Sequence, residues 1–372
     1  MLALSLGLAM EPQASQANQI VGVRCVLSSE LTLSVVDQSP MRHGETGAHA
    51  LRDTVELAKA VEALGYARFW VAEHHSTGTF AGTSPEILVG QILANTSQIR
   101  VGSGGVMLTH YSAMKVAEQF RMLDSFYPGR VDLGIGRAPG SDQRTMMALA
   151  YPKRPAEVET FPQQVLDVMG YLHNGLQADH PFVSLKVAPG LKPETAPEIW
   201  LLGSSDYSAR LAAQLGLPFA FADFFGTTSG HGPTVAKLYR QEFKPSELCE
   251  VPRLNVTIQV ICAPTAEEAE RVSASRNFNR ARRVLGIQGE EIGDGILPPD
   301  EAAAISLPEN VKAHVQTYID GCIDGDPEQV KMGILAASER YETKDVGIVS
   351  ITYALADRIR SYELVARAFG LL

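Results

Sequence analysis

The feature that most constrains the fold is a regular alternation, from residue 31 onward, of short β-type runs with longer amphipathic segments. Segments 48–64 and 84–96 carry apolar residues at helical spacing, the second after a Ser and a Pro that typically open a helix. Alternating strands and helices favour parallel strands joined by crossover helices. Eight runs have strand length and strand-type residues: 31–37, 68–73, 99–108, 131–136, 199–203, 218–222, 253–262 and 345–352. Eight such units predict an α/β fold, a (β/α)8 TIM barrel with insertion loops, rather than an open sheet.

The length of 372 residues is compatible with one such barrel, because these barrels commonly reach ~250 residues or more as a single domain. We expect residues 31–372 to form that domain and residues 1–30 to be an N-terminal extension outside it. The apolar start of the chain lacks the preceding basic residues and the cleavage site of an export signal. Two stretches, 179–197 and 286–310, lack helical or strand periodicity and are expected to be irregular insertions, the second a candidate lid.

Composition limits the classes of partner. The formal charge is -10, with 32 Lys and Arg against 42 Asp and Glu, and no basic run suited to nucleic acid is present. No apolar run reaches the ~20 residues that span a bilayer. The cysteines are scattered, without zinc-ligand spacing, at positions 25, 249, 262 and 322. We therefore expect a reduced, cytoplasmic protein that takes a small-molecule substrate and has neither a nucleic-acid nor a membrane partner.

Glycines gather where the third predicted strand should end. Gly102, Gly104 and Gly105 remove side chains at the carboxyl end of 99–108, the end at which α/β barrels bind their ligands. Two explanations remain open at this point. Bare main chain would let a flat or bulky cofactor lie against the strand, whereas a glycine-rich β-bulge would need no ligand.

A Glu-His-His sequence follows the second predicted strand. A histidine at the carboxyl end of a barrel strand is placed to transfer protons near neutral pH, a role typically worth roughly 10² to 10⁴ in rate. Only one of two adjacent strand residues can face the pocket, and we assign that position to His74. Glu73 is a candidate to orient the histidine pair, and Gln38 and Met107 are candidate pocket walls, as is Asp37. A hydrogen-bonded structural histidine is the alternative, and a metal is not expected, because helical metal-ligand spacing is absent.

An anion site is predicted at the ends of the fourth and fifth strands. Arg137 closes the fourth, and an arginine fork binds oxyanions bidentately, although an ion pair with Asp142 would equally account for it. After the fifth strand, the hydroxyls of Ser204, Ser205 and Ser208 stand beside the backbone N–H groups of a helix start, unless the first two merely cap that helix. Because the two strands are neighbours in the predicted barrel, both groups would face one phosphate, which indicates a monophosphate cofactor.

Taken together, four blocks resemble the bacterial luciferase-like flavin monooxygenases. They are VAEHH at 71–75, VGSGGVML at 101–108, AEQFRMLDSFYPGRVDLGIGRAPGSD at 117–142 and LLGSSDYSARLAAQLGLPFAF at 201–221. The resemblance extends from residue 31 to 369 and is nearest to the non-luminescent, alkanal-monooxygenase-like subgroup. It implies a (β/α)8 barrel, reduced FMN from a separate NAD(P)H-dependent flavin reductase, use of dioxygen, and often a homodimer.

The resemblance also implies residue roles. His74 matches the active-site base, and Gly104-Gly105 match the position of a non-prolyl cis peptide under the flavin ring. Arg137, Ser204, Ser205 and Ser208 match the positions that hold the FMN phosphate. Gly136 and Ser204 depart from the light-emitting enzymes, which have a reactive cysteine and a glutamate there, so light emission is not expected.

The favoured hypothesis is an FMN-dependent monooxygenase that oxidises a small organic substrate, aldehyde-like or other. One alternative on the same barrel is a deazaflavin-dependent oxidoreductase with no oxygen step. Another is a non-catalytic flavin-binding protein.

Overall fold

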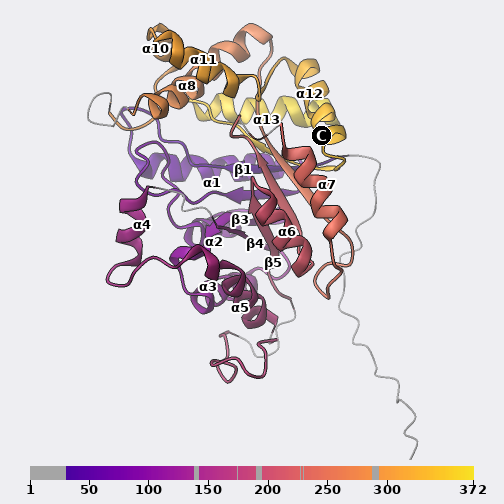
Figure 1. The fold of residues 1–372 in the computed structure, drawn as a ribbon. Coiled ribbons are helices and arrows are strands. Elements are labelled where there is room, and N and C mark those ends of the chain that lie inside the picture. The colour runs from indigo at the N-terminus through magenta and orange to yellow at the C-terminus, as the bar shows by residue number, and fades with distance from the viewer. Residues whose placement is uncertain are drawn as a thin grey trace, which may run out of the picture. The chain divides into compact units, whose positions relative to one another are not determined.

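Parallel strands close into a barrel in the computed structural model, which describes residues 31–137, 142–173, 175–189, 195–226, 228, 230–286 and 293–372 (Figure 1). Strand order is β6-β5-β4-β3-β2-β1-β9-β7, and pairing of β6 with β7 closes the ring. The barrel strands are β1 (Thr32–Asp37), β2 (Arg68–Val71), β3 (Arg100–Met107), β4 (Val131–Gly136), β5 (Glu198–Gly203), β6 (Phe219–Asp223), β7 (Leu254–Cys262) and β9 (Asp345–Val349). This confirms the predicted TIM barrel. The expected extension, 1–30, lies outside the described residues.

Helices cover the outside of the barrel, and α1 packs against both α13 and α2. The helices are α1 (Gly47–Ala63), α2 (Pro85–Asn95), α3 (Ala113–Phe126), α4 (Gln143–Ala150), α5 (Phe161–His173), α6 (Asp206–Leu215), α7 (Gly232–Glu242), α8 (Ala266–Leu285), α10 (Pro299–Ala304), α11 (Glu309–Ile319), α12 (Pro327–Arg340) and α13 (Leu355–Phe369). Local chemistry fixes several ends: Asp326 and Gln329 form a capping box at the start of α12. Glycine in the left-handed conformation ends α8 at Gly286 and α13 at Gly370.

Two apolar layers hold the barrel together. The larger lies between strands and helices and includes Val35, Phe69 and Val101, none of which is exposed. The smaller fills the inside of the barrel, where Trp70 and Trp200 meet edge to face with ring centroids 5.3 Å apart. Side chains therefore fill this part of the barrel interior, and the pocket lies toward the carboxyl ends of the strands.

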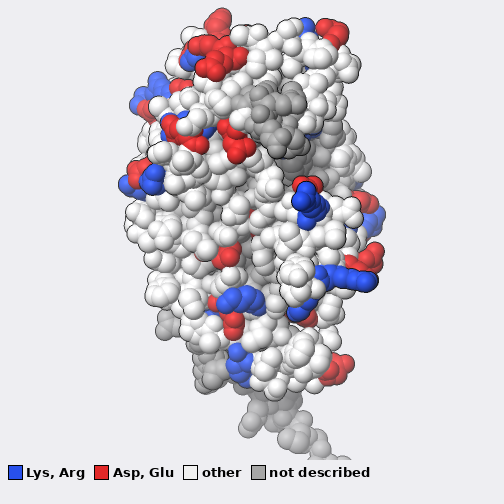
Figure 2. All heavy atoms as spheres, turned by 90° about the vertical axis from the view of Figure 1, so that its left-hand side faces the viewer, with Lys and Arg blue, Asp and Glu red and all other residues white. Residues whose placement is uncertain are grey.

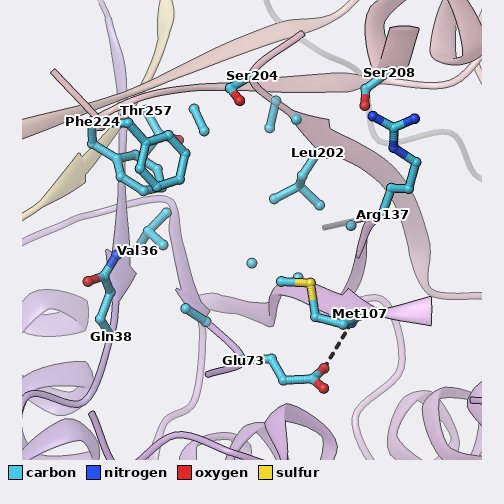
Figure 3. Close-up of a pocket in the computed structure, with 18 of the residues that line it drawn as sticks. Val36, Gln38, Glu73, Met107, Arg137, Leu202, Ser204, Ser208, Phe224 and Thr257 are labelled. Carbon is cyan, nitrogen blue, oxygen red and sulfur yellow. Dashed lines mark hydrogen bonds between the residues drawn. The ribbon is translucent and has the colours of Figure 1, made fainter. Parts of the chain in front are cut away.

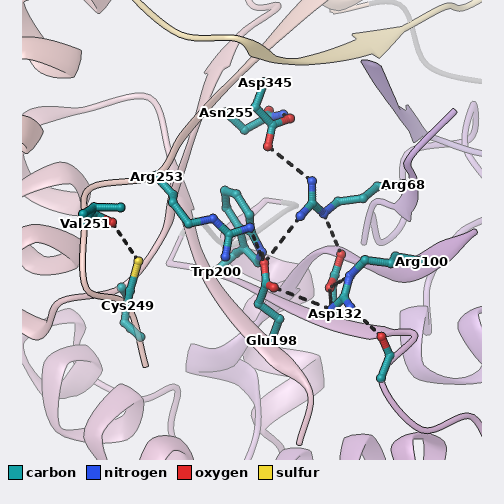
Figure 4. Close-up of polar contacts among 12 residues, drawn as sticks. Arg68, Arg100, Asp132, Glu198, Trp200, Cys249, Val251, Arg253, Asn255 and Asp345 are labelled. Atoms are coloured by element: carbon teal, nitrogen blue, oxygen red, sulfur yellow. Dashed lines mark hydrogen bonds and ion pairs between the residues drawn. The ribbon is translucent and has the colours of Figure 1, made fainter. Parts of the chain in front are cut away.

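Charged side chains close the barrel at the amino ends of its strands (Figure 4). Asp132 is fully buried, accepts a hydrogen bond from the Trp70 indole (2.9 Å) and pairs with Arg68 (3.3 Å) and Arg100. Arg68 also reaches Asp345 at 3.3 Å. Because every member comes from the start of a different strand, this network ties the strands to one another at the end away from the pocket.

The predicted irregular stretch 286–310 is partly wrong. Residues 299–304 form α10, and α11 begins at Glu309, while 287–292 lie outside the described residues. A short strand, β8 (Ile323–Gly325), was not predicted; it pairs with β7 beyond the barrel. Strand β2 ends at Val71, two residues before the predicted end. Of the stretch 179–197, the part that is described lacks helix and strand up to Pro197, and 190–194 are not described.

The described helices include none with the length and apolar character needed to cross a bilayer. Figure 2 shows the side of the molecule on which α4 lies in Figure 1. Acidic and basic side chains are interspersed on that face, and neither kind forms a continuous patch there.

Candidate active site

A pocket opens at the carboxyl ends of the barrel strands (Figure 3). It contains about 920 Å³ of space free of protein atoms, part of which is open to solvent. Its walls are Val36, Gln38, Ala72, Glu73, His74, Gly104, Gly105, Met107, Gly136, Arg137, Leu202, Gly203, Ser204, Ser205, Ser208, Ala220, Ala222, Phe224, Phe225 and Thr257.

Bare backbone of β3 forms one wall of the pocket. The peptide bond between Gly104 and Gly105 is cis, and the pairing of β3 with β4 shifts register between Ser103 and Val106. A Cβ at Gly105 would lie 2.7 Å from the Gly134 carbonyl oxygen, and one at Gly104 would lie 3.1 Å from Trp70 Cβ. A side chain at Gly105 would overlap the backbone of β4, and one at Gly104 would crowd Trp70. This wall of the pocket therefore consists of glycine main chain.

A cationic and hydroxyl-rich corner lies where β4 and β5 end. Arg137 and Ser208 lie close together on one side of the pocket in Figure 3. The Arg137 guanidinium lies 4.2 Å from the centre of the Tyr207 ring, a stacked position that leaves its N–H donors directed sideways. Ser205 precedes α6 without a side-chain cap, so the first N–H groups of this helix have no hydroxyl acceptor from it. This corner is suited to an oxyanion.

Glu73 is held rigidly beside the pocket. Its buried carboxylate accepts hydrogen bonds from the Met107 backbone N–H (2.9 Å), from the Tyr111 hydroxyl (2.7 Å) and at 2.7 Å from a ring nitrogen of His75. Burial, and the negative charge of Glu73 beside it, raise the pKa of Tyr111, so the phenol stays protonated and donates. His75 thus turns toward Glu73, and His74 lines the pocket.

His74 is the pocket-facing titratable group whose environment is most altered. Burial, and then the positive charge of Arg283 and the neighbouring His75, lower the pKa of His74 to about 4. Its Nδ1 atom is buried and has no hydrogen-bond partner among the residues that the structure describes. Its ring packs against Phe80 with centroids 5.1 Å apart. At neutral pH His74 is therefore an uncharged imidazole with one nitrogen available to a ligand.

The structure brings all the predicted site residues to this single pocket: His74, Gly104, Gly105, Arg137, Ser204, Ser205 and Ser208. Gln38 and Met107 also line it. Asp37 does not, because its carboxylate pairs with Arg358 at 3.2 Å and accepts from Thr54 at 2.6 Å. Glu73 and His74 both line the pocket, because β2 has already ended at Val71 and strand alternation no longer separates them.

Several pocket residues were missed by the sequence reasoning. Phe224 and Phe225 directly follow β6, and their position at a strand's carboxyl end was an available signal. Thr257 lies within the long apolar β7, and which of its residues point inward is decided by the barrel register.

Comparison with known proteins gives a consistent result. The family model described as luciferase-like monooxygenase matches residues 31–341. The chain belongs to the luciferase-like monooxygenase family. Like its relatives in that family, it is an enzyme of the monooxygenase class.

Individual relatives of this luciferase-like monooxygenase match over nearly the whole chain. An N-acetyl-S-alkylcysteine monooxygenase from Bacillus subtilis (strain 168) is 35% identical over 339 residues, covering 91% of this chain and 98% of that protein. The crystal structure of apo-MsnO8 has a TM-score of 0.81 at 36% identity, covering 92% of this chain and 99% of that one. The oxygenating constituent of 3,6-diketocamphane monooxygenase from Pseudomonas putida, in complex with FMN, shares the fold with a TM-score of 0.67 at 19% identity, covering 91% and 97%.

Proposed function

We propose that this protein is an FMN-dependent monooxygenase that receives reduced FMN from a partner flavin reductase and oxidises a small organic substrate with dioxygen. The observation that carries the proposal is the combination, in one pocket, of an oxyanion corner at Arg137 with a wall of bare glycine main chain. A flavin mononucleotide needs both features: donors for its phosphate and a flat, side-chain-free surface for its ring system.

The residues present fit FMN. Arg137, the serine hydroxyls and the free N–H groups of α6 would hold the phosphate, because each is a donor at the same corner of the pocket. Gly104 and Gly105 line the pocket without side chains, and they would face the ring system. The family membership and the FMN named in the structure of the diketocamphane enzyme support the same cofactor.

The protein's own groups would position reactants and move protons. Reduced FMN, when bound, supplies the electrons that activate dioxygen. His74 is uncharged at neutral pH, so its unpartnered Nδ1 can accept a proton from substrate or cofactor and return it later. Glu73 is a positioning residue, because its three hydrogen bonds fix His75, Tyr111 and the end of β3 around the pocket. Phe224, Phe225 and Leu202 would keep water from the reacting atoms.

The proposal extends to the domain organisation, the location and the oligomeric state of the protein. We propose residues 31–372 as a single domain, a cytoplasmic location and a homodimer. Cys249, Cys262 and Cys322 are free thiols, a state usual in a reducing compartment.

The decisive experiment supplies the purified protein with FMN, NADH and a flavin reductase under ¹⁸O₂. A panel of substrates should include a long-chain aldehyde and an N-acetyl-S-alkylcysteine, the compound class for which the Bacillus relative is named. We expect one ¹⁸O atom in the product by mass spectrometry and the other in water. Turnover with a reduced deazaflavin in the absence of oxygen would contradict the proposal, as would tight FMN binding without turnover of any panel member.

A further inference from the structure

A second compartment adjoins the main pocket on the side away from Arg137. The two share Gln38, His74, Phe224 and Phe225 as walls. In Figure 3, Gln38 and Phe224 lie across the pocket from Arg137 and Ser208. The second compartment therefore adjoins the side of the main pocket opposite the proposed phosphate site.

Two hydrogen-bond donors in this compartment lack acceptors among the described residues. Gln259, on β7, is 1% exposed, and its Nε2 atom is buried without a partner in the described part of the chain. The same part of the chain offers no acceptor to the buried Nε atom of Arg280, on α8. Both residues line the compartment. Because a buried donor without an acceptor is unfavourable, such a pair indicates a ligand that supplies acceptor atoms.

The charge of the compartment is positive. Arg276 is neutralised by Asp324 in a bidentate ion pair with contacts of 2.8 and 2.5 Å. Within the described residues, Arg280 and Arg283 form no ion pair with a carboxylate. Arg280 lies over the Tyr318 ring and donates a long hydrogen bond of 3.5 Å to the Phe225 backbone carbonyl, and Arg283 lies over the Phe80 ring. Burial, and the like charge of Arg280, lower the pKa of Arg283. Two guanidinium groups side by side favour a ligand that carries negative charge.

Aromatic side chains form much of the remaining wall of the compartment, beside the polar Asn279. Phe80, Phe224, Phe225 and Tyr318 line it together with Ile351. An acceptor group bound to Gln259 and the arginines would therefore be followed by an apolar section that leads past His74 into the main pocket. His74 lines both compartments, so the ligand passes the group proposed to move protons.

We propose that this compartment is the substrate's recognition site, and that the substrate carries a carboxylate or a similar anionic group on an apolar body. The anionic group binds Arg280, Arg283 and the Gln259 amide, and the apolar section places the atom to be oxidised near His74. This inference rests on the proposed function, because it assigns the main pocket to the flavin.

The test uses octanoate and its uncharged analogue octanamide as probes. Binding of each is measured by isothermal titration calorimetry, with the protein loaded with oxidised FMN and again without FMN. We expect octanoate to bind at least about tenfold more tightly than octanamide. Arg280→Gln and Arg283→Gln should each remove most of that preference. Gln259→Leu should weaken the binding of both probes, because each offers a carbonyl oxygen that can accept from the Gln259 amide.

A matched control lies on the same helix. Arg271 pairs with Glu268 at 2.8 Å and is not a wall of this compartment, so Arg271→Gln should keep the full preference for octanoate. Unchanged FMN affinity in all four variants shows that each one is folded. Equal affinity for the two probes, no detectable binding of octanoate, or a preference that survives in both compartment arginine variants would overturn the inference.

The outcomes separate this inference from the proposed function. Octanoate that competes with FMN would place the anion at the Arg137 corner and overturn the recognition site alone. A wild-type protein that binds no FMN contradicts the proposed function, whereas the probe preference measured without FMN still reports on the compartment itself.

Discussion

At the scale of single residues, Arg137 is the strongest test of the cofactor assignment. The Arg137→Ala protein should bind FMN more weakly by roughly 1.5 to 3 kcal/mol, the usual value for a hydrogen bond to a charged group. Arg210→Ala is the matched control, because Arg210 lies on α6, the helix whose Tyr207 contacts Arg137, and it pairs with Glu242 at the surface and does not line the pocket. Fluorescence titration of FMN measures both, and equal affinities for Arg137→Ala and wild type would refute the phosphate assignment.

His74 makes a second prediction at this scale. The His74→Ala protein should bind FMN almost normally and lose at least tenfold in turnover at neutral pH, on the scale of general acid-base catalysis. Because burial and Arg283 lower the pKa of His74 to about 4, the imidazole is already unprotonated throughout pH 6 to 8. The wild-type rate should therefore show no inflection near pH 6.5. An inflection there that disappears in His74→Ala would show that the pKa is not lowered.

At this scale, the sequence was sufficient to identify pocket-lining residues that directly follow a predicted strand. His74, Arg137 and Ser204 each follow a predicted strand, and barrels direct such positions into one mouth. Sequence reasoning failed where partners come from distant segments. Tyr111 donates to Glu73 across 38 positions of sequence, and Arg280 reaches the site from a helix that no local pattern places there.

At the scale of elements, the glycines of β3 predict a stability difference. Gly105→Ala should lower the free energy of unfolding by about 1 to 3 kcal/mol, because the new Cβ meets the Gly134 carbonyl at 2.7 Å and backbone cannot move aside cheaply. Gly136→Ala is the control at the same pocket: its Cβ would meet Met107 Sδ at 3.4 Å, Met107 Cε at 3.6 Å and the Val106 carbonyl oxygen at 3.9 Å, all ordinary contact distances. Urea unfolding measures the free energy of unfolding of both variants. Equal values for Gly105→Ala and Gly136→Ala would contradict the close approach of β3 to β4.

Elements were predictable where periodicity is long and regular. The segment predicted as helix over 48–64 is α1 at Gly47–Ala63, because its apolar residues repeat on one face through several turns. The helix α10 was missed because its six residues make fewer than two turns, too few for an apolar repeat to be recognised. The three residues of β8 carry Asp324 and Gly325, which are not strand-type residues, so only pairing with β7 makes them a strand.

At the scale of the whole molecule, stability depends on pH through the charged closure, the ion-pair network at the amino ends of the barrel strands. Its members are Arg68, Arg100, Asp132, Glu198, Arg253 and Asp345. Burial alone would raise the pKa of Glu198, but Arg253, Arg68 and Arg100 outweigh it and lower the pKa to about 2. Glu198 therefore stabilises the fold above its ordinary pKa of 4.5, and that contribution is lost as pH falls toward 2.

The Glu198→Gln protein should thus be less stable than wild type at pH 7, by on the order of 2 kcal/mol, and the difference should shrink at pH 3. Denaturant unfolding at several pH values measures this. Glu363→Gln serves as the comparison, since Glu363 pairs with Arg360 and Arg367 on the exposed side of α13, where solvent screens the charges. A difference between Glu198→Gln and wild type that is constant with pH would show that Glu198 is not an ionised partner of the arginines.

The charged closure has a consequence for how this enzyme tolerates change. Its members stand at the amino ends of the strands, whereas Gln38, Phe224 and Phe225 stand at the opposite rim. Randomising these rim residues in a directed-evolution library leaves the charged closure unchanged. Many variants with altered substrate specificity should therefore still fold and be open to selection.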